Sequence, residues 1–316
     1  MQLQTHIPLE TQKHNLIDYH SRILFIGSCF SENISKKCEY YKFKNSVNPF
    51  GILFQPLAIE RLILNAINEK VFSENDVFYS NEQWHSFDAH SNLSAVSKMD
   101  VLDNLNTQIE FTIKQIRKAS HCFISLGTAW VYRHVESDQI VANCHKVPNT
   151  NFIKELLTVN EVYESLQSII ALIRSVNNET SIIFTISPVR HLKDGFVENT
   201  QSKSHLISAV HQVIEPRNKV HYFPSYEIMM DELRDYRYYD QDMIHPSDTA
   251  IKYIWQKFVD TWVSSDSFPM MDQVEIIQKG LSHKPFKVDS EAHQQFLLHL
   301  KEKQQELQNQ FPHIAF

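Results

Sequence analysis

Ser28 and Cys29 directly follow an apolar run that ends in Gly27, within the segment RILFIGSCF. Residues 23–26 are typical of a buried strand, and the polar stretch after Cys29 is typical of a helix, with Ser31 as a candidate N-cap. Free N–H groups at a helix start favour the thiolate of a cysteine, which is a strong nucleophile. Because a free cysteine is more often a small core residue, Cys29 alone does not predict catalysis.

Asp242 and His245 stand near the other end of the chain, in the sequence QDMIHPSD. The Asp-x-x-His spacing lets one loop present both side chains, with the carboxylate fixing the imidazole tautomer. By itself this spacing is typical of an ordinary surface loop. Together with a thiol or hydroxyl at Ser28 or Cys29, it predicts a nucleophile activated by a His–Asp pair, the chemistry of acyl transfer.

Strands and helices alternate along the chain in a way that predicts how these groups meet. Apolar runs at 23–26, 122–126, 181–186 and 220–223 indicate buried strands, and stripes near 56–66, 102–116, 162–173, 201–214 and 251–262 indicate helices. This order is typical of a parallel sheet covered by helices on both faces. The carboxyl ends of its strands gather residues 27–29, 127–129 and 187–191 at one edge, where such sheets bind ligands.

Composition narrows the class of protein. The chain has 316 residues, 42% of them hydrophobic, and a net charge of −7, which disfavours a nucleic-acid partner. No apolar run reaches the roughly 18 residues of a membrane span, and the polar N-terminus does not resemble a signal peptide. The four cysteines form no Cys-x-x-Cys pair. A cytoplasmic protein is therefore expected.

The predicted organisation is one α/β domain over residues 1–264 with a helical extension packed on it. Residues 70–100 are expected to form an irregular, lid-like insertion, and residues 130–145 a hairpin. Residues 265–316 carry no strand signal and include a Gln-rich helix from about 289 to 310.

Further polar residues near the expected strand ends are open to two interpretations. Asn143, His145 and Lys146 could bind an anionic group or a sugar hydroxyl, or could be the solvated end of the hairpin. Arg190 could hold a carboxylate or phosphate, or could pair with a structural aspartate.

Two other groups are expected to have minor roles. His85, Asp88 and His90 could ligate a divalent ion, but their spacing matches no metal motif, so a polar lid is the preferred interpretation. Ser202 and Lys203 are expected at the start of a helix, where they could contact a substrate, but a position facing water is the preferred interpretation.

The segments GSCFSENI, NPFGILFQP, LGTAW, VANCHKVPN, SPVRH and DMIHPS resemble those of the GSCFA family, within the SGNH (GDSL-like) hydrolase superfamily. The resemblance covers roughly residues 20–264. It implies a flavodoxin-like three-layer sandwich and a nucleophile–His–Asp triad. Matched without a gap, Gly27, Ser28 and Cys29 stand at the superfamily's Gly-Asp-Ser. Cys29 is therefore the first choice of nucleophile and Ser28 the second, and Asp242 and His245 match the Asp-x-x-His block.

The resemblance also implies an oxyanion hole made by the nucleophile's N–H, a glycine N–H and an asparagine side chain. Gly51 matches the glycine. The third block has Gly127-Thr128-Ala129 where the superfamily has Gly-x-Asn, so the asparagine is absent. Loss of one donor typically costs ~3 kcal/mol of transition-state stabilisation. Thr128 or Asn143 could replace it.

Three hypotheses follow. The first is a hydrolase or acyltransferase that acts on O-acyl esters, carbohydrate esters among them, through a covalent acyl-enzyme and without a metal or other cofactor. The second is a non-catalytic ligand-binding protein on the same scaffold. The third is a metal-dependent hydrolase that uses the segment from His85 to His90. The sequence does not indicate the acyl group, the acceptor or the oligomeric state.

Overall fold

The computed structural model describes residues 5–316 and has a five-stranded parallel sheet at its centre, in the order β10-β9-β5-β1-β2. The strands are β1 (Arg22–Gly27), β2 (Lys44–Val47), β5 (His121–Leu126), β9 (Ser181–Ile186) and β10 (Val220–Tyr222). β5 and β9 are buried at every residue because helices cover both faces of the sheet. The predicted parallel sheet is confirmed. The short polar β2 (KNSV) was not predicted, since it lacks an apolar run.

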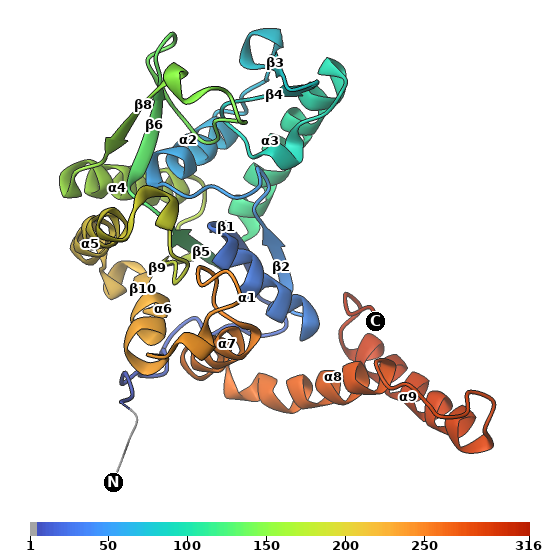
Figure 1. Cartoon of the computed structure of the whole chain (residues 1–316). Helices are drawn as coiled ribbons and strands as arrows, with labels where there is room; N and C mark the ends of the chain where they lie inside the picture. Colours follow the sequence, from blue (N-terminus) through green and yellow to red (C-terminus); the bar gives the residue numbers. More distant parts are fainter. Residues whose placement is uncertain (1–4) are drawn as a thin grey trace.

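Two layers of helices enclose this sheet (Figure 1). α2 (Pro56–Ile67), α3 (Lys98–Lys118), α4 (Val159–Val176) and α5 (Phe196–Val213) pack on one face, and α1 (Cys29–Tyr40) and α7 (Asp248–Trp262) on the other. Alternate residues of β1 point to opposite faces, so Leu24 joins the first core and Phe25 the second. The expected three-layer sandwich is confirmed.

A smaller β-rich part lies beyond α2 and α3, at the top of Figure 1. The predicted hairpin is present as β6 (Trp130–His134) and β7 (Gln139–Val141), and β8 (Phe152–Leu156) pairs with the other edge of β6. The expectation that residues 70–100 are irregular is wrong in part. β3 (Phe78–Ser80) and β4 (Gln83–His85) form a hairpin that places Tyr79 opposite Trp84. A strand of three residues is too short to show an alternating pattern.

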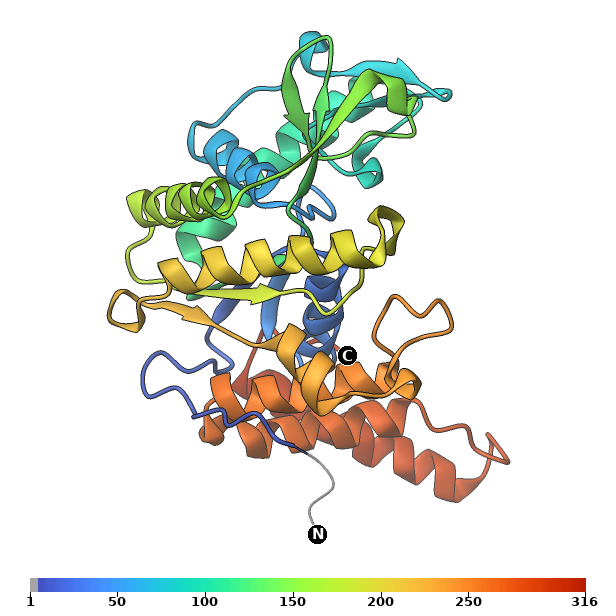
Figure 2. The ribbon, with the colours of Figure 1, turned by 60° about the vertical axis from the view of Figure 1, so that its left-hand side comes forward.

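The C-terminal segment is helical, as expected, with α8 (Phe268–Leu281) and α9 (Glu291–Gln310). The two helices lie against each other beneath α7 in Figure 2. Val274 and Ile277 of α8, and Leu300 and Leu307 of α9, belong to the core cluster that also contains α1 and α7. The boundary at residue 264 stays a prediction.

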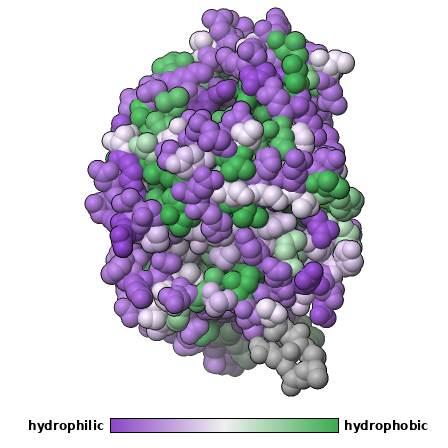
Figure 3. All heavy atoms as spheres, turned by 90° about the vertical axis from the view of Figure 1, so that its left-hand side faces the viewer, coloured by the Kyte–Doolittle hydropathy of each residue, from purple (hydrophilic) through white to green (hydrophobic). Residues whose placement is uncertain are grey.

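The face in Figure 3 carries mainly hydrophilic side chains, among which hydrophobic ones form small separate groups. None of the helices in residues 5–316 is both long enough and apolar enough to cross a membrane. The cysteines are all free thiols, and those of Cys38 and Cys122 are buried in the core.

Candidate active site

The turn after β1 is built around Gly27. Its φ of +126° is a conformation that side chains rarely adopt, and a Cβ there would lie 2.1 Å from the carbonyl oxygen of Ser125. Ser28 is fully buried and shares a 2.7 Å hydrogen bond with the Ser125 hydroxyl. Its Oγ also accepts from the N–H of Phe30, so Ser28 caps α1. Through its bond to Ser125, Ser28 thus links the turn to β5.

Ser31 does not cap the helix, contrary to the expectation. Ser31 is the third residue of α1, and its hydroxyl donates to the carbonyl oxygen of Ile26 in β1, 3.2 Å away. The cap falls three residues earlier because the helix begins at Cys29, directly after the strand.

Cys29 is the first residue of α1 and is partly exposed. Burial raises the pKa of its thiol, and the carboxylate of Glu32 adds to this effect. The N–H groups of Cys29 and Phe30, and the ammonium of Lys203, act in the opposite direction. The thiolate that the helix start was expected to favour is therefore not the resting form, because desolvation outweighs the helix N-terminus. A base must remove the proton.

Asp242 and His245 form the predicted pair. The carboxylate Oδ2 lies 2.6 Å from Nδ1 of His245, and Oδ1 accepts the backbone N–H groups of Ile244 and His245 at 2.8 and 2.9 Å. These bonds to His245 and Ile244 lower the pKa of Asp242 to about 2. Nε2 of His245 has no hydrogen-bond partner in the described part of the chain, so it is available as a base. No hydrogen bond joins it to Cys29 or Ser28 there, and the complete triad stays a prediction.

Gly51 lies in a tight turn that rests against the Ser28–Cys29 turn. Its N–H donates to the carbonyl oxygen of Asn48 at 2.7 Å, and the Asn48 side chain accepts the N–H of Gly27 at 2.8 Å. The N–H of Gly51 is therefore already used within the turn. The next N–H, that of Ile52, has no acceptor among the described residues.

Thr128 follows β5 and packs against α5. Its hydroxyl lies 3.0 Å from that of Ser202 and accepts the N–H of Trp130, while Ser202 also accepts the N–H of Ala129. These bonds fix the segment Gly127-Thr128-Ala129, where the resemblance described above led us to expect an asparagine. The Thr128 hydroxyl is thus engaged in the scaffold and is not a free oxyanion donor.

Lys203 differs most from its prediction. It does not face water: it is 1% exposed, and its Nζ donates to the carbonyl oxygens of Gly127 and Ser187, both at 2.7 Å. Burial lowers the pKa of Lys203 to about 7, and the charge of Cys29 opposes this shift. The buried stripe of α5 contains Asn199, Ser202, Lys203 and Leu206. This spacing of three and four residues was the sequence signal for a buried lysine.

His191 also lies at the strand ends. A Cβ on Gly127 would be 2.8 Å from its Nε2, which is buried and has no hydrogen-bond partner among the described residues. Burial, followed by the charges of Lys203 and His245, lowers the pKa of His191 to about 3. The ring is therefore neutral near pH 7. Buried nitrogens without a partner are rare and often mark functional positions.

The cluster from Asn143 to Lys146 belongs to the β-rich part. Asn143 accepts the N–H of His145, and Nε2 of His145 lies 2.7 Å from the carbonyl oxygen of Ser86. His145 is 5% exposed, and burial lowers its pKa to about 4. No contact brings these side chains to Cys29 in the described residues. Their role in substrate binding stays a prediction.

The side chains from His85 to His90 that could ligate a metal are engaged with other protein groups. Both ring nitrogens of His85 bond to Ser94 and Ser80, and Asp88 forms ion pairs with Arg61 and Lys70. Across residues 5–316, no three or more His, Cys, Asp or Glu side chains are grouped to hold a metal ion. The segment does approach the site, because His90 donates its N–H to Phe50, next to Gly51.

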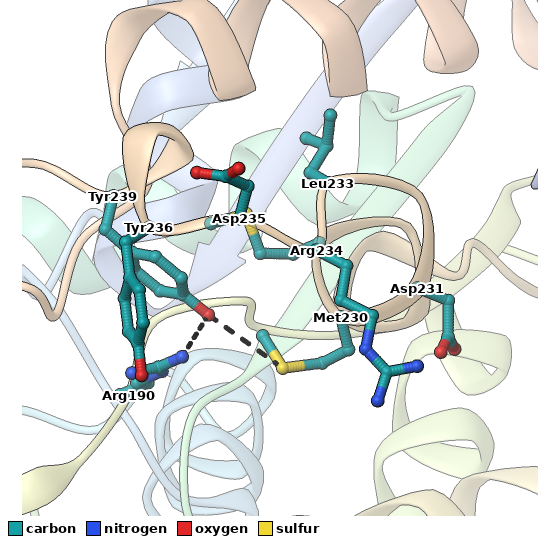
Figure 4. Close-up of a pocket in the computed structure, with 9 residues that line it drawn as sticks. Arg190, Met230, Asp231, Leu233, Arg234, Asp235, Tyr236 and Tyr239 are labelled. Atoms are coloured by element: carbon teal, nitrogen blue, oxygen red, sulfur yellow. Dashed lines mark hydrogen bonds between the residues drawn. The ribbon is translucent and has the colours of Figure 1, made fainter. Parts of the chain in front are cut away.

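A cavity of about 410 Å³ adjoins the loop that carries His245 (Figure 4). Arg190 lines it and lies against the ring of Tyr239, whose hydroxyl accepts from the guanidinium at 2.7 Å. The N–H of Arg190 donates to Ile244, between Asp242 and His245. Within the described chain no carboxylate lies within 4.0 Å of the Arg190 guanidinium, so the structural ion pair considered above is absent.

Comparisons with known proteins give two family matches. A model of the GSCFA family matches residues 22–258, and one described as GSCFA domain protein, C-terminal domain, matches residues 274–316. A search of curated proteins finds no match.

Similar solved structures include an acetyl esterase mutant with acetate ion, with 8% identity and a TM-score of 0.37 over 80% of this chain and 99% of that chain. A family 3 carbohydrate esterase from Clostridium thermocellum has 10% sequence identity and a TM-score of 0.36, and the match covers 82% of this chain and 98% of that chain. A carbohydrate esterase of family 3 from Talaromyces cellulolyticus has 7% sequence identity and a TM-score of 0.35, and the match covers 81% of this chain and 99% of that chain.

Proposed function

The chain belongs to the GSCFA family, and we propose that it is an SGNH-type hydrolase or acyltransferase acting on O-acyl esters through Cys29. The observation that carries the proposal is the Asp242–His245 pair. Its 2.6 Å bond fixes Nδ1 of His245 and leaves Nε2 without a partner among the described residues. A partly exposed thiol at the start of α1 is the matching nucleophile.

Nε2 of His245 takes the proton of the Cys29 thiol, and the sulfur attacks the acyl carbonyl carbon. The C–O bond of the ester breaks, and the alcohol leaves with the proton from His245. Water or an acceptor hydroxyl, deprotonated by His245, then attacks the thioester. The acid or new ester leaves, and Cys29 recovers its proton.

The oxyanion needs donors, and three are proposed. The N–H of Cys29 is unused by the helix that it begins. The N–H of Ile52 takes the place of the engaged N–H of Gly51. Nε2 of His191, protonated in its neutral tautomer, takes the place of the missing asparagine beside Gly127.

Hydrolysis of a panel of p-nitrophenyl esters tests this proposal. We expect release of p-nitrophenolate with an acyl adduct on the peptide that contains Cys29. Cys144→Ser is the matched control, because Cys144 is also partly exposed but its burial raises its thiol pKa to about 11. No turnover and no adduct on any ester would instead support the non-catalytic binding protein. The absence of a Cys29–His245 hydrogen bond in the described residues favours that second candidate.

Arg190 is proposed to bind an anionic group of the substrate in the 410 Å³ cavity. For an ester that carries a carboxylate, Arg190→Gln should raise KM by about 10- to 100-fold, since a hydrogen bond to a charged group contributes ~1.5–3 kcal/mol. The KM for a neutral ester of equal size should stay unchanged. Arg237→Gln is the control, because Arg237 is exposed and does not line the cavity. An equal loss with both esters would contradict this role.

A further inference from the structure

The α8–α9 hairpin packs against the rest of the chain along only part of its length. Val274 and Ile277 of α8, with Leu300 and Leu307 of α9, join the core cluster that also contains α1 and α7. From residue 278 to residue 299, by contrast, no residue is buried. This end of the hairpin, which we call the hairpin tip, projects beyond the α/β body (Figure 1, Figure 2). Short helical segments are marginal in water unless an apolar face packs against another surface.

Large apolar side chains of the hairpin tip remain exposed. They are Leu281, Phe286, Val288, Phe296, Leu297 and Leu298. Phe286, which lies in the loop between the helices, has a relative exposure of 112% and is fully exposed. A stable interface buries about 800 Å² on each partner, and the exposed parts of these side chains amount to apolar surface of that order. Apolar surface concentrated in this way marks an interaction site.

A groove of about 700 Å³ lies between the two helices at the tip, beside Phe286. Ile276 of α8, and Ala292 and Phe296 of α9, line it together with Pro285 from the loop. Every residue that lines the groove belongs to the segment 276–296, so no other part of residues 5–316 covers it. The groove is therefore an apolar site that a side chain from outside can enter.

The charges at the tip select the kind of partner. Lys279 is paired with Glu275 at 2.7 Å. The other two lysines of the tip are matched in number by its two carboxylates, Asp289 and Glu291. A surface with balanced charge has little attraction for nucleic acid or for an anionic lipid surface, because these bind clusters of basic residues. A partner with an equally balanced, apolar surface fits better, and a second copy of this chain supplies one.

We propose that the hairpin tip is the interface of a homodimer, in which Phe286 of each copy enters the groove of the other. A twofold axis makes this contact reciprocal, so each copy supplies one inserted ring and one groove. Asp289 and Glu291 lie close to Phe286 in the sequence, and Lys287 lines the groove. Each insertion thus also brings carboxylates towards an ammonium of the other copy. The tip lies in the segment 274–316, which a separate family model matches, and the proposal does not rest on acyl transfer.

Sedimentation velocity of the full chain, measured over a range of protein concentrations, tests this interface. We expect a reversible equilibrium between monomer and dimer. Phe286→Ser should raise the dissociation constant at least about 100-fold, because burial of the ring is lost twice across the twofold axis. Phe196→Ser is the matched control, since Phe196 is 69% exposed at the start of α5, and its dissociation constant should equal that of the parent. A parent protein that is monomeric at every concentration, or a dimer that Phe286→Ser does not weaken, would overturn the proposal.

Cross-linking between two single variants tests the contact itself. Phe286→Cys and Ala292→Cys, each in a Cys29→Ser, Cys144→Ser background, are mixed and oxidised, and the linked peptides are identified by mass spectrometry. A disulfide that joins the two variants can form only between copies, and we expect it in this mixture but not when Phe196→Cys replaces Phe286→Cys. Absence of the mixed disulfide would contradict the proposed contact. A monomer that co-sediments with phosphatidylglycerol vesicles, and no longer does so as Phe286→Ser, would also overturn the proposal and assign the tip to a lipid surface.

Discussion

Cys29→Ala should abolish acyl transfer, whereas Ser28→Ala should keep a measurable rate. Removing a nucleophile that acts with a His–Asp pair typically lowers kcat by a factor on the order of 10⁴ to 10⁶. Ser28 is fully buried and bonded to the Ser125 hydroxyl, so its Oγ does not face a substrate. Its loss should mainly lower the free energy of unfolding, by about 1–3 kcal/mol, through the lost cap and the unpaired Ser125 hydroxyl.

A labelled acylating probe, proteolysis and mass spectrometry locate the reacting atom. Ser31→Ala is the control for stability, because it removes a comparable buried hydroxyl that bonds to Ile26. Thermal unfolding of Ser28→Ala and Ser31→Ala should show similar losses. An adduct on Ser28 with Cys29 unmodified would refute the assignment of the nucleophile, although the Asp242–His245 pair would survive.

His245→Ala should lower kcat by at least about 10³-fold, and Asp242→Asn by about 10²- to 10⁴-fold, because the second change leaves the imidazole without its orienting carboxylate. The pKa of Asp242 lies at about 2, below its ordinary value of 3.8. Its stabilising interaction with His245 is thus fully present above pH 3.8 and is lost as the pH falls through about 2. The pH–rate profile measured from about pH 4 upward should contain no ionisation of Asp242.

Asp240→Asn provides the control for this pair. Asp240 lies in the same loop, but its carboxylate accepts the N–H of Gln241 and does not touch the His245 ring. Its kcat should equal that of the parent protein. Parent-like turnover by His245→Ala would show that another base removes the proton of Cys29.

Much of the α/β scaffold could be predicted because the sequence patterns that indicate its strands lie within short continuous segments. The runs at β1, β5 and β9 are apolar without interruption, since these strands are buried on both faces, and parallel strands of this kind bring their carboxyl ends to one edge. The Asp242–His245 contact could be predicted too, because both residues lie in one loop.

The sequence by itself thus determined the sandwich, the turn after β1 and the Asp–His loop. Only the tertiary structure decided which hydrogen-bond partners each polar group near Cys29 has, and which of these groups remain available to a substrate. Lys203 is bonded to the ends of two strands far away in sequence, Thr128 to Ser202, and Nε2 of His191 is left without a partner in the described residues. Hydrogen-bond partners and desolvation depend on packing between distant segments. For that reason the burial of Cys29, which raises its pKa against the helix N-terminus, has no signature in the local sequence.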